Sequence, residues 1–478
     1  MTGSNHNYDA VIVGSGPNGL AAAITMARKG LSVLVIEGQD TIGGGTRTAE
    51  LTLPGFWHDV CSAIHPLGMA SPFMRSLPLA EYGLEWVIPP AAVAHPLDDA
   101  PAVMIERSLE QTTQGLGNDQ YAYLRLVEPL VANWEKLTAD LLGPFPLPPK
   151  HPFLDLAFGI KGISSARGLA ERRFKAKRAR AVLAGMAGHA IMPLEKPLTA
   201  AFGLMMFMLS HAVGWPLARG GSTKITEAMA AYLRSLGGEI QTGWEVKSLD
   251  ALPRSRAVFL SLSPRAVLGI AGERLPAGYR RQLNGYRYGP ALFKVDWALD
   301  GPIPWKDPAV LRSATVHLGG TLEEIAASER QVWAGEHSEQ PYIILAQQSL
   351  FDDSRAPEGK HTAWAYCHVP NGSTVDMTAQ IEAQVERFAP GFRDLILARF
   401  TRNPLEMEAY NPNYVGGDIN VGVQDIRQFF TRPTLSLVPY ATPLKGLYLC
   451  SSATPPGGGV HGMCGYHAAQ VALRRDFR

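Results

Sequence analysis

Three glycines and one acid near the start of the sequence have the spacing of a dinucleotide-binding turn. Gly14, Gly16 and Gly19 form a GxGxxG motif, and Glu37 ends the apolar run that follows the next helix-forming segment. In such a motif the first glycine allows a tight turn, the second lets the backbone approach a pyrophosphate, and the third lets helix and strand pack closely. The helix N-terminus would offer free N–H groups to phosphate, and Glu37 lies where a ribose hydroxyl would bind.

A second glycine-rich segment, near the other end of the sequence, has the features of a platform for a flat ring. The stretch GLYLCSSATPPGGGVHGMCGYHAA (446–469) reads as a strand, a loop almost without side chains, and a helix that starts near Val460 to Met463. A planar ligand could pack on the bare main chain of this loop. The helix N-terminus would favour negative charge on that ligand by about 0.3–1 kcal/mol, and by up to ~2 kcal/mol when buried.

The elements that must position these residues follow from the apolar pattern. Residues 11–13 form a continuous apolar run, and residues 20–28 favour a helix. Residues 31–37 form a second apolar run that ends at Glu37. Together the three segments predict a βαβ unit. Residues 237–249 are predicted to form two short strands, and residues 257–267 a further strand and turn. The first three segments therefore place the glycine motif at a turn between strand and helix.

Bulk composition limits the class of protein. A chain of 478 residues is too long for one compact core, so at least two domains are expected. Charged residues make up 18% and hydrophobic residues 46%, which is typical of a folded protein, and a net charge of +1 gives no sign of nucleic-acid binding. The four cysteines include no CxxC pair, so neither a metal site nor a redox dithiol is expected, and a reducing, cytoplasmic compartment fits. The polar N-terminal residues leave no room for a signal peptide before the first strand.

Several motifs resemble those of one flavoprotein family. Gly43, Gly44 and Gly45, followed by Arg47, resemble the second glycine cluster of FAD-binding proteins in the glutathione-reductase and amine-oxidase superfamily. The stretches NPNYVGGDINVG, RPTLSL and the 446–469 segment resemble the phytoene desaturase-type flavoproteins, which include retinol saturase and carotenoid isomerase. The likeness covers essentially the whole chain and points to the branch named pyridine nucleotide-disulfide oxidoreductase domain-containing protein 2. The sequence contains neither the paired cysteines nor the second GxGxxG unit that this branch name implies.

The resemblance implies an α/β fold with a Rossmann-like FAD-binding domain of the glutathione-reductase/amine-oxidase type and an inserted α+β substrate domain. The FAD-binding domain is expected to be discontinuous and to comprise residues 1–75, 217–270 and 411–478. The substrate-binding domain is expected to comprise residues 76–216 and 271–410, with a helical, basic and apolar part at about 150–216.

The resemblance also implies FAD as the cofactor and carries its contacts onto particular positions. The expected cofactor-binding residues are Gly14, Ser15, Gly16, Pro17, Asn18, Gly19, Glu37, Gly38, Gly44, Gly45, Thr46, Arg47, Val246, Ser452, Gly458, Gly459, Val460, His461 and Met463. Val246 is expected to give backbone contacts on the adenine side. Arg47 could add charge near the pyrophosphate or could be a solvated loop residue. No metal is expected.

The expected reaction is hydride transfer between the flavin N5 atom and a carbon–carbon bond of a hydrophobic, isoprenoid- or lipid-like substrate, in either desaturation or saturation. Without a nicotinamide domain, electrons from a desaturation would pass to oxygen, a quinone or another acceptor. The acid or base of the reaction is not assigned. His461, His211 and His368 are weak candidates, and satisfied buried histidines describe His211 and His368 better.

Three other functions fit the same motifs. A reduced flavin could isomerise a double bond without net redox change. An amine oxidase would need an aromatic cage beside the ring, for which Tyr410, Tyr414 and Trp215 are candidates. A carrier of prenylated or lipidic ligands, similar to the Rab GDP-dissociation inhibitors, would have the same architecture but would not catalyse a reaction. The retained glycine motif, Glu37 and the Gly457–Gly459 loop argue against a lost cofactor.

Two segments in the middle of the sequence bear on membrane contact and on substrate binding. Residues 199–218 are the most apolar stretch and approach the length of a bilayer span, but Ser210, His211 and Pro216 favour a pocket wall or a core segment. Residues 167–183 are strongly basic, and as a helix they could lie on anionic lipid or form a solvated face. The expected partner is a hydrophobic small molecule and not nucleic acid, while peripheral membrane contact and oligomeric state are left open.

Overall fold

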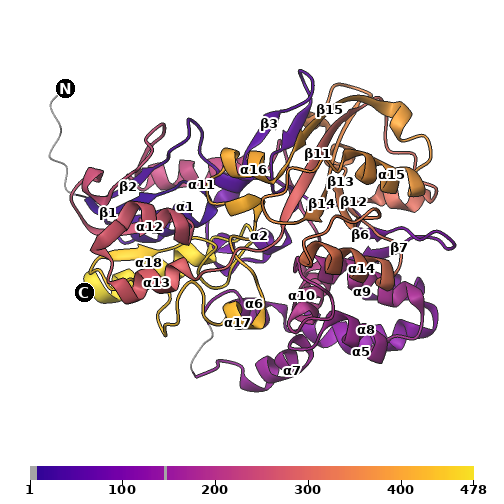
Figure 1. Cartoon of the computed structure of the whole chain (residues 1–478), viewed down its shortest axis with the longest axis horizontal. Coiled ribbons are helices and arrows are strands. Elements are labelled where there is room, and N and C mark those ends of the chain that lie inside the picture. Colours follow the sequence, from indigo (N-terminus) through magenta and orange to yellow (C-terminus); the bar gives the residue numbers. More distant parts are fainter. Residues whose placement is uncertain (1–7, 145–147) are drawn as a thin grey trace.

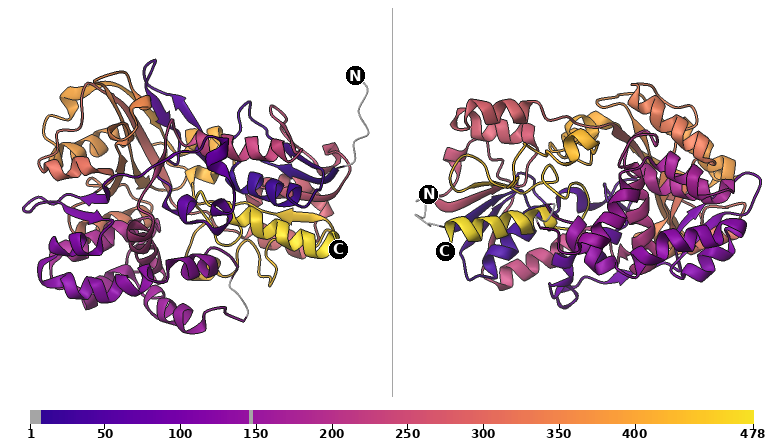
Figure 2. Two further views of the ribbon diagram at one scale, coloured as in Figure 1. Left: turned by 180° about the vertical axis from the view of Figure 1, so that it is seen from behind. Right: turned by 90° about the horizontal axis from the view of Figure 1, so that it is seen from below.

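The computed structural model describes residues 8–144 and 148–478, and predictions that concern residues 1–7 lie outside these described residues. Figure 1 shows one sheet on the side of the two chain ends, and a second sheet with a group of helices beside it. Figure 2 shows the same division from behind and from below, with the C-terminal helix along the first sheet in both views.

The first sheet holds the glycine motif. It has five parallel strands in the order β16-β10-β1-β2-β9. Their bounds are β1 Tyr8–Val13, β2 Val33–Ile36, β9 Glu239–Gln241, β10 Ser255–Leu260 and β16 Leu447–Leu449. Because β10 pairs with both β1 and β16, the N-terminal and C-terminal segments of the chain meet in one sheet.

Helices cover both faces of this sheet, which explains why its strands are continuous apolar runs. Ala10 and Ile12 of β1 pack with α1, α11 and α18, whereas Val11 and Val13 pack with α12 and α13 on the opposite face. The bounds of these helices are α1 Pro17–Ala27, α11 Thr223–Ser235, α12 Pro264–Ala271, α13 Ala277–Asn284 and α18 Met463–Asp476. Burial on two faces makes β1 a firmly packed base for the turn that follows it.

The second sheet is mixed and has seven strands in the order β15-β11-β14-β13-β12-β6-β7. Their bounds are β6 Ala91–His95, β7 Val103–Glu106, β11 Ala291–Leu299, β12 Ser313–Leu318, β13 Ile343–Ala346, β14 His361–Val369 and β15 Ile396–Arg402. Neighbouring strands are antiparallel except β6 and β12, which are parallel. One core joins this sheet to α14 (Leu322–Trp333) and to the helical group, and another joins it to α15 (Thr378–Phe388).

The helical group beside the second sheet comes from one continuous part of the chain. Its members are α4 Leu109–Gln114, α5 Gln120–Val131, α6 Trp134–Leu141, α7 Pro152–Gly162, α8 Ala166–Arg173, α9 Lys177–Gly188 and α10 Thr199–Ala212. The shorter elements are α2 Pro66–Ala70, α3 Pro72–Arg75, α16 Pro404–Tyr410 and α17 Ile426–Phe429, with two small sheets that pair β3 Thr48–Glu50 with β4 Trp57–Asp59 and β5 Trp86–Val87 with β8 Leu217–Ala218.

The most apolar stretch of the sequence forms α10, and the prediction of a core or pocket-wall segment is confirmed. Phe207 and Met208 are fully buried in the core that α10 shares with α5 and α9. Across residues 8–144 and 148–478, none of the helices combines the length and the apolar character that a bilayer span requires.

The prediction of two strands in residues 237–249 is wrong for the second strand. Only β9 forms, and Gly243 then turns the chain with a φ of +68°. The amides of Gly243 and Trp244 donate to the carbonyls of Gln39 and Glu37 at 2.9 Å each. These two hydrogen bonds fix the chain beside Glu37, and the residues that lead to Val246 form no further strand.

The prediction of one basic helix at residues 167–183 is also wrong. α8 ends at Arg173, and α9 begins at Lys177. The Asp119 carboxylate accepts hydrogen bonds from the amides of Lys175 (2.9 Å) and Ala176 (2.7 Å), so it holds the chain extended between the two helices. A carboxylate 56 residues away along the chain therefore interrupts a sequence that would otherwise favour continuous helix.

The predicted α/β fold class, with a Rossmann-like dinucleotide-binding part and an additional part built on a second sheet, is confirmed. The strands of the first sheet fall within the three ranges predicted for FAD binding, and those of the second sheet fall within the two ranges predicted for the substrate. The domain limits themselves remain predictions.

Candidate functional site

Two cavities meet at the C-terminal ends of the first sheet's strands. The first, which we call the glycine cavity, has a volume of about 450 Å³ and is lined by Gly14, Gly16, Glu37 and Val246 among others. The second, which we call the apolar cavity, has a volume of about 280 Å³. It is lined by residues that flank the first sheet and by residues of the second sheet. The residues that line both cavities are Pro17, Asn18, Gly45, Tyr414, Val421 and Ser452.

The glycine turn after β1 has the geometry that its sequence predicts. Gly14 has a φ of +99°, which favours glycine, and its amide donates to the Ile36 carbonyl at 2.7 Å. A Cβ on Gly19 would lie 1.9 Å from the Gly14 carbonyl oxygen, so only glycine fits where α1 passes the turn. No side chain caps the start of α1, whose N-cap residue is Gly16. The first N–H groups of α1 are therefore left for a ligand.

Glu37 is buried and is held in one orientation by several donors. Its Oε2 atom accepts from the Ser15 amide at 2.9 Å and the Ser15 hydroxyl at 2.6 Å, while Oε1 accepts from the Gln39 amide at 3.0 Å. The Arg47 guanidinium lies 3.4 Å from Oε1. A carboxylate fixed in this way at the edge of the glycine cavity suits recognition of ribose hydroxyls.

Arg47 is buried and lines the glycine cavity, so it is not the solvated loop residue that the sequence left open. Its guanidinium donates to the Thr41 carbonyl at 2.7 Å and lies 5.5 Å from the centre of the Tyr410 ring. Its charge is thus fixed beside the glycine cavity.

The C-terminal loop reaches the apolar cavity through its bare main chain. Gly458, Gly459 and Val460 line this cavity. Gly459 has a φ of +125°, and a Cβ on Gly458 would lie 2.7 Å from the Asn420 side-chain oxygen. α18 then begins at Met463, in agreement with the predicted helix start.

Asn18 connects the two chain ends where the two cavities meet. Its Nδ2 atom donates to the Ser452 hydroxyl at 3.4 Å, and a Cβ on Gly465 of α18 would lie 1.7 Å from its carbonyl oxygen. Its Oδ1 atom is buried and has no hydrogen-bond partner within the described chain. An unpaired polar atom at this place, with uncapped N–H groups and a fixed carboxylate nearby, fits a bound dinucleotide.

The structure brings most of the predicted cofactor residues to these cavities. The glycine cavity is lined by Gly14, Gly16, Pro17, Asn18, Glu37, Gly38, Gly44, Gly45, Arg47, Val246 and Ser452. The apolar cavity is lined by Pro17, Asn18, Gly45, Thr46, Ser452, Gly458, Gly459 and Val460. The predicted residues that line neither cavity are Ser15, Gly19, His461 and Met463. For all of the predicted residues, contact with a cofactor remains a prediction.

The three candidate histidines of the sequence line neither cavity. His211 bonds the Tyr123 hydroxyl at 2.7 Å and the Arg107 carbonyl at 3.2 Å, as a satisfied buried histidine does. His368 lies 2.8 Å from the Glu329 carboxylate through Nδ1. His461 is buried, and its Nδ1 atom accepts from the Met463 amide at 3.0 Å.

The apolar cavity carries no charged side chain. Across the part of the chain that is described, no Asp, Glu, Lys or Arg lines it, and its titratable side chains are Cys61, His65, His189, Tyr366 and Tyr414. Burial raises the pKa of Cys61, Tyr366 and Tyr414, so these groups keep their protons. Burial lowers the pKa of His65 to about 4 and that of His189 to about 3. All five groups are therefore neutral at pH 7.

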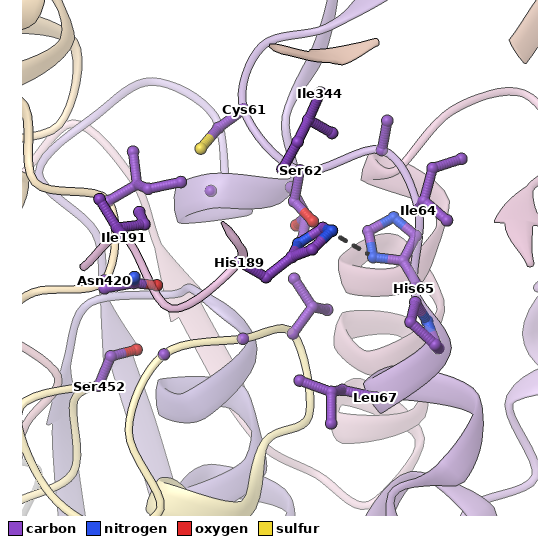
Figure 3. Close-up of a pocket in the computed structure, with 18 of the residues that line it drawn as sticks. Cys61, Ser62, Ile64, His65, Leu67, His189, Ile191, Ile344, Asn420 and Ser452 are labelled. Carbon is purple, nitrogen blue, oxygen red and sulfur yellow. Dashed lines mark hydrogen bonds between the residues drawn. The ribbon is translucent and has the colours of Figure 1, made fainter. Parts of the chain in front are cut away.

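Aromatic and aliphatic side chains form the rest of the apolar cavity. Trp364 and Tyr366 are stacked with their ring centroids 5.6 Å apart, and α10 contributes Phe202 and Met206. Figure 3 shows Cys61, Ile64, Leu67 and Ile191 around this space. The three residues suggested for an aromatic cage do not share one cavity: Trp215 lines only the apolar cavity, Tyr410 only the glycine cavity, and Tyr414 both.

Sequence reasoning missed most of the apolar cavity. Cys61, His65 and His189 lie on loops or helix ends, and Trp364 and Tyr366 lie on a strand whose residues are nearly all buried. None of these belongs to a motif with fixed spacing. For the glycine cavity a signal was present, because residues 411–413 and 421 lie within the NPNYVGGDINVG stretch that carried the family resemblance.

Comparisons with known proteins agree with this geometry. The model of the family described as NAD(P)-binding Rossmann-like domain matches residues 12–77. Pyridine nucleotide-disulfide oxidoreductase domain-containing protein 2 of Mus musculus is 26% identical over 98% of this chain and 93% of its own. One of the limonene dehydrogenase subunits of Castellaniella defragrans is 21% identical over 98% and 94%, and the neurosporene-forming phytoene desaturase of Rhodobacter capsulatus is 23% identical over 95% and 92%.

Solved structures show the same fold at low identity. An oxidoreductase from Methanosarcina mazei has a TM-score of 0.66 and 17% identity over 98% of this chain and 100% of its own. Wild-type putrescine oxidase bound to putrescine has a TM-score of 0.62 and 19% identity, again over 98% and 100%. The chain is therefore similar along nearly its whole length to oxidoreductases that include a phytoene desaturase, and it shares its fold with putrescine oxidase.

Proposed function

We propose that the protein is an FAD-dependent oxidoreductase that desaturates or saturates a carbon–carbon bond of a hydrophobic, isoprenoid- or lipid-like substrate. One observation supports the proposal: a cavity that no charged side chain of the described residues lines shares wall residues with the cavity that the glycine motif lines. Two relatives whose names refer to limonene and phytoene, both isoprenoid hydrocarbons, support the substrate class.

The same observation argues against an amine as substrate. A protonated amine that leaves water needs a carboxylate or a set of aromatic faces to replace its hydration. The apolar cavity offers no carboxylate in the described chain, so the aromatic faces of Trp215, Trp364, Tyr366 and Tyr414 would have to replace this hydration alone. A neutral hydrocarbon needs neither and gains about 25 cal/mol for each Å² of apolar surface that it buries.

The residues of the glycine cavity would bind the cofactor, and those of the apolar cavity would bind the substrate. When bound, FAD would supply the acceptor or donor of a hydride. The uncapped first turn of α1 offers N–H donors to a pyrophosphate, and Glu37 offers a carboxylate to ribose hydroxyls. The apolar walls exclude water from the substrate, which prevents side reactions during hydride transfer.

The visible spectrum of the purified protein and an anaerobic substrate screen test this proposal together. We expect a yellow protein that releases FAD on denaturation, and bleaching of the flavin bands by phytoene, limonene or another isoprenoid, but not by putrescine. A colourless protein that FAD cannot reconstitute would favour a carrier. Bleaching by putrescine alone would favour an amine oxidase, and a changed double-bond geometry without net flavin reduction would favour an isomerase.

We also propose that the protein contacts membranes, with α7 as the main contact. Phe153, Leu156 and Ile160 recur on one face of α7 and are exposed, Phe153 by 88%, and the exposed Ile163 follows directly after the helix. Figure 1 shows α7 at the margin of the molecule. Exposed basic side chains nearby in sequence are Arg172, Arg173, Lys175 and Lys177, and Lys161 is half-buried. Apolar and basic side chains together suit an anionic bilayer surface.

The double substitution Phe153→Glu and Ile160→Glu is expected to lower binding to phosphatidylcholine vesicles that contain phosphatidylserine at least about tenfold, because two apolar contacts worth roughly 1.5–3 kcal/mol each are lost. Co-sedimentation measures the effect. Leu397→Glu is the matched control, since Leu397 is exposed on β15. Equal binding of both variants, or binding independent of phosphatidylserine, would contradict the proposal.

A further inference from the structure

One tyrosine hydroxyl at the apolar cavity has no partner within the protein. Tyr366 lies on β14, where every other residue except His361 at the start of the strand is buried. Tyr366 itself is half-buried and lines the apolar cavity. Across residues 8–144 and 148–478 its hydroxyl makes no hydrogen bond, and it is not one of the polar atoms that the protein encloses completely. The hydroxyl is therefore open to a molecule in the cavity.

The polar neighbours of Tyr366 are engaged elsewhere. Lys294 lies opposite Tyr366 on β11 and pairs with the buried carboxylate of Asp296. His368 lies two residues further along β14, and its Nδ1 atom is 2.8 Å from the Glu329 carboxylate. Because these pairs form within the protein, a molecule in the cavity has to supply the partner of the Tyr366 hydroxyl.

Packing holds the Tyr366 hydroxyl in place as a donor. The Tyr366 ring stacks on Trp364, with ring centroids 5.6 Å apart and an angle of 18° between the ring planes. On β13 the opposite residue is Ile344, so a paired strand flanks Tyr366 on each side. Burial raises the pKa of Tyr366, and the hydroxyl keeps its hydrogen at neutral pH. A neutral phenol of this kind donates one hydrogen bond.

Two amide side chains of the apolar cavity lie on the predicted cofactor side. The Asn420 oxygen would lie 2.7 Å from a Cβ on Gly458, and the Gln424 oxygen would lie 3.6 Å from a Cβ on Gly457. Both amides thus border the loop that is predicted to bind FAD. Tyr366 lines the apolar cavity and is not one of the wall residues that both cavities share. An oxygen bound by Tyr366 would therefore not lie at that shared wall.

The histidines of the apolar cavity add uncharged polar groups. Nε2 of His65 lies 2.8 Å from the Ser222 hydroxyl, and its Nδ1 atom lies 3.4 Å from the Ser62 hydroxyl. Nε2 of His189 lies 3.0 Å from Nε2 of His317, and Figure 3 shows the His189 ring at the cavity. His65 and His189 are neutral at pH 7, because burial lowers the pKa of both. Within the described chain, the lining of the cavity thus offers no positive charge to a carboxylate or a phosphate.

Two kinds of ligand would leave a polar or charged group without its counterpart. A pure hydrocarbon that filled the cavity would expel water and leave the Tyr366 hydroxyl unpaired. A charged ligand would lose its hydration without gaining an ion pair. An uncharged oxygen on an otherwise apolar molecule accepts the hydrogen of Tyr366 and brings no charge into the cavity, so it avoids both costs.

We propose that the substrate is a hydrophobic isoprenoid- or lipid-like molecule with an uncharged oxygen, as a hydroxyl or a carbonyl, and that Tyr366 donates a hydrogen bond to this oxygen. This inference rests on the function proposed above and names the class of substrate. Tyr366 is then a residue that determines specificity. The carbon–carbon bond that reacts lies in the hydrocarbon part, nearer the wall that the two cavities share.

The first test compares three ligands with the same ring: limonene, its alcohol carveol and its ketone carvone. Binding to the FAD-loaded protein is followed by tryptophan fluorescence, since Trp215 and Trp364 line the apolar cavity. Tyr366→Phe is expected to bind carveol and carvone at least about tenfold more weakly than the wild type. Limonene should bind to this variant as well as to the wild type, or better, because the variant buries no unpaired hydroxyl.

The control variant is Tyr121→Phe, because Tyr121 is exposed on α5, and it should bind all three ligands like the wild type. Tyr366→Phe keeps the ring that stacks on Trp364, so it should fold like the wild type. Equal changes for the three ligands, no change, or a wild type that binds neither carveol nor carvone would overturn the inference.

The second test reads the hydrogen bond itself. A hydrogen bond to a carbonyl oxygen lowers the frequency of the C=O stretching band. In carvone bound to the wild type this infrared band should therefore lie at a lower frequency than in carvone bound to Tyr366→Phe, an effect that a merely structural role of Tyr366 would not cause. The same frequency in both proteins would refute the hydrogen bond.

Anaerobic flavin reduction separates this inference from the proposed function. With an oxygenated isoprenoid that bleaches the flavin, Tyr366→Phe should raise KM at least about tenfold and leave kcat nearly unchanged, because the bond to Tyr366 lies away from the reacting carbons. A lower kcat at unchanged KM would contradict the role of Tyr366 in binding. If no isoprenoid bleaches the flavin, the proposed function fails, and the binding and infrared measurements still decide whether Tyr366 binds an oxygen.

Discussion

The variant Gly16→Ala is expected to fold like the wild type and to bind FAD at least about tenfold more weakly, a loss of about 1.4 kcal/mol or more. Gly16 has a φ of −69°, which suits any residue, and the nearest atom to its Cβ would be the Gly44 Cα at 3.8 Å. The protein alone therefore accommodates the methyl group. Gly16 lines the glycine cavity at the start of α1, so that methyl group would meet a pyrophosphate bound there.

Titration of the cofactor-free variant with FAD, followed by absorbance, measures this effect. Gly278→Ala is the matched control, because Gly278 lies on α13 and no atom lies within 4 Å of its Cβ position. Gly19→Ala should differ from both and destabilise the protein itself, since its Cβ would meet the Gly14 carbonyl. Unaltered FAD affinity in Gly16→Ala would show that the pyrophosphate does not lie at this turn.

The variant Arg355→Met is expected to lower the free energy of unfolding by about 3–5 kcal/mol at pH 7. The Arg355 side chain is buried, pairs with Asp59 and lies 3.6 Å from the Asp352 carboxylate. Methionine fills similar space but leaves both carboxylates buried without this positive charge. Asp59 also accepts from the Ser222 amide at 2.8 Å, so the loss should spread to the start of α11.

The effect of Arg355→Met should shrink as the pH falls. Burial alone would raise the pKa of Asp59, but Arg355 and the hydrogen bonds from Ser222 and Thr48 outweigh it, and the pKa is lowered. A carboxylate with a lowered folded-state pKa stabilises the fold above its unfolded pKa of about 3.9, and this stability is lost as the pH falls through the folded pKa. The wild type therefore loses in acid the contribution that the variant already lacks.

Urea unfolding at several pH values measures both effects. The control is Arg274→Met, because Arg274 and its partner Asp250 are exposed, and such surface pairs contribute about 0–1 kcal/mol. Equal unfolding midpoints for Arg355→Met and Arg274→Met would show that the buried pair does not stabilise the fold.

Local pattern was sufficient for the dinucleotide-binding half of the site. The GxGxxG motif, the helix and the strand that ends before Glu37 lie within one short segment, and the structure has them as β1, α1 and β2. The C-terminal strand, bare loop and helix start were also predictable, because only glycine tolerates the backbone and the close contacts of that loop.

Local pattern failed where a distant residue competes for the backbone. The basic run of residues 167–183 favours a helix by composition, but the Asp119 carboxylate binds the amides between α8 and α9. The second strand expected in residues 237–249 is absent because the amides of Gly243 and Trp244 donate to the main chain near Glu37 instead. Neither partner can be read from the segment itself.

The amino-acid sequence was enough to establish the fold class and to predict the place of a dinucleotide, because both depend on contiguous residues with a fixed period. The apolar cavity and the grouping of three histidines beside it were decided only by the folded chain. His95, His189 and His317 come from β6, the end of α9 and β12, and no spacing connects them. They meet because β6 and β12 pair in parallel and α9 packs against that sheet, with Gly185 leaving room for the rings.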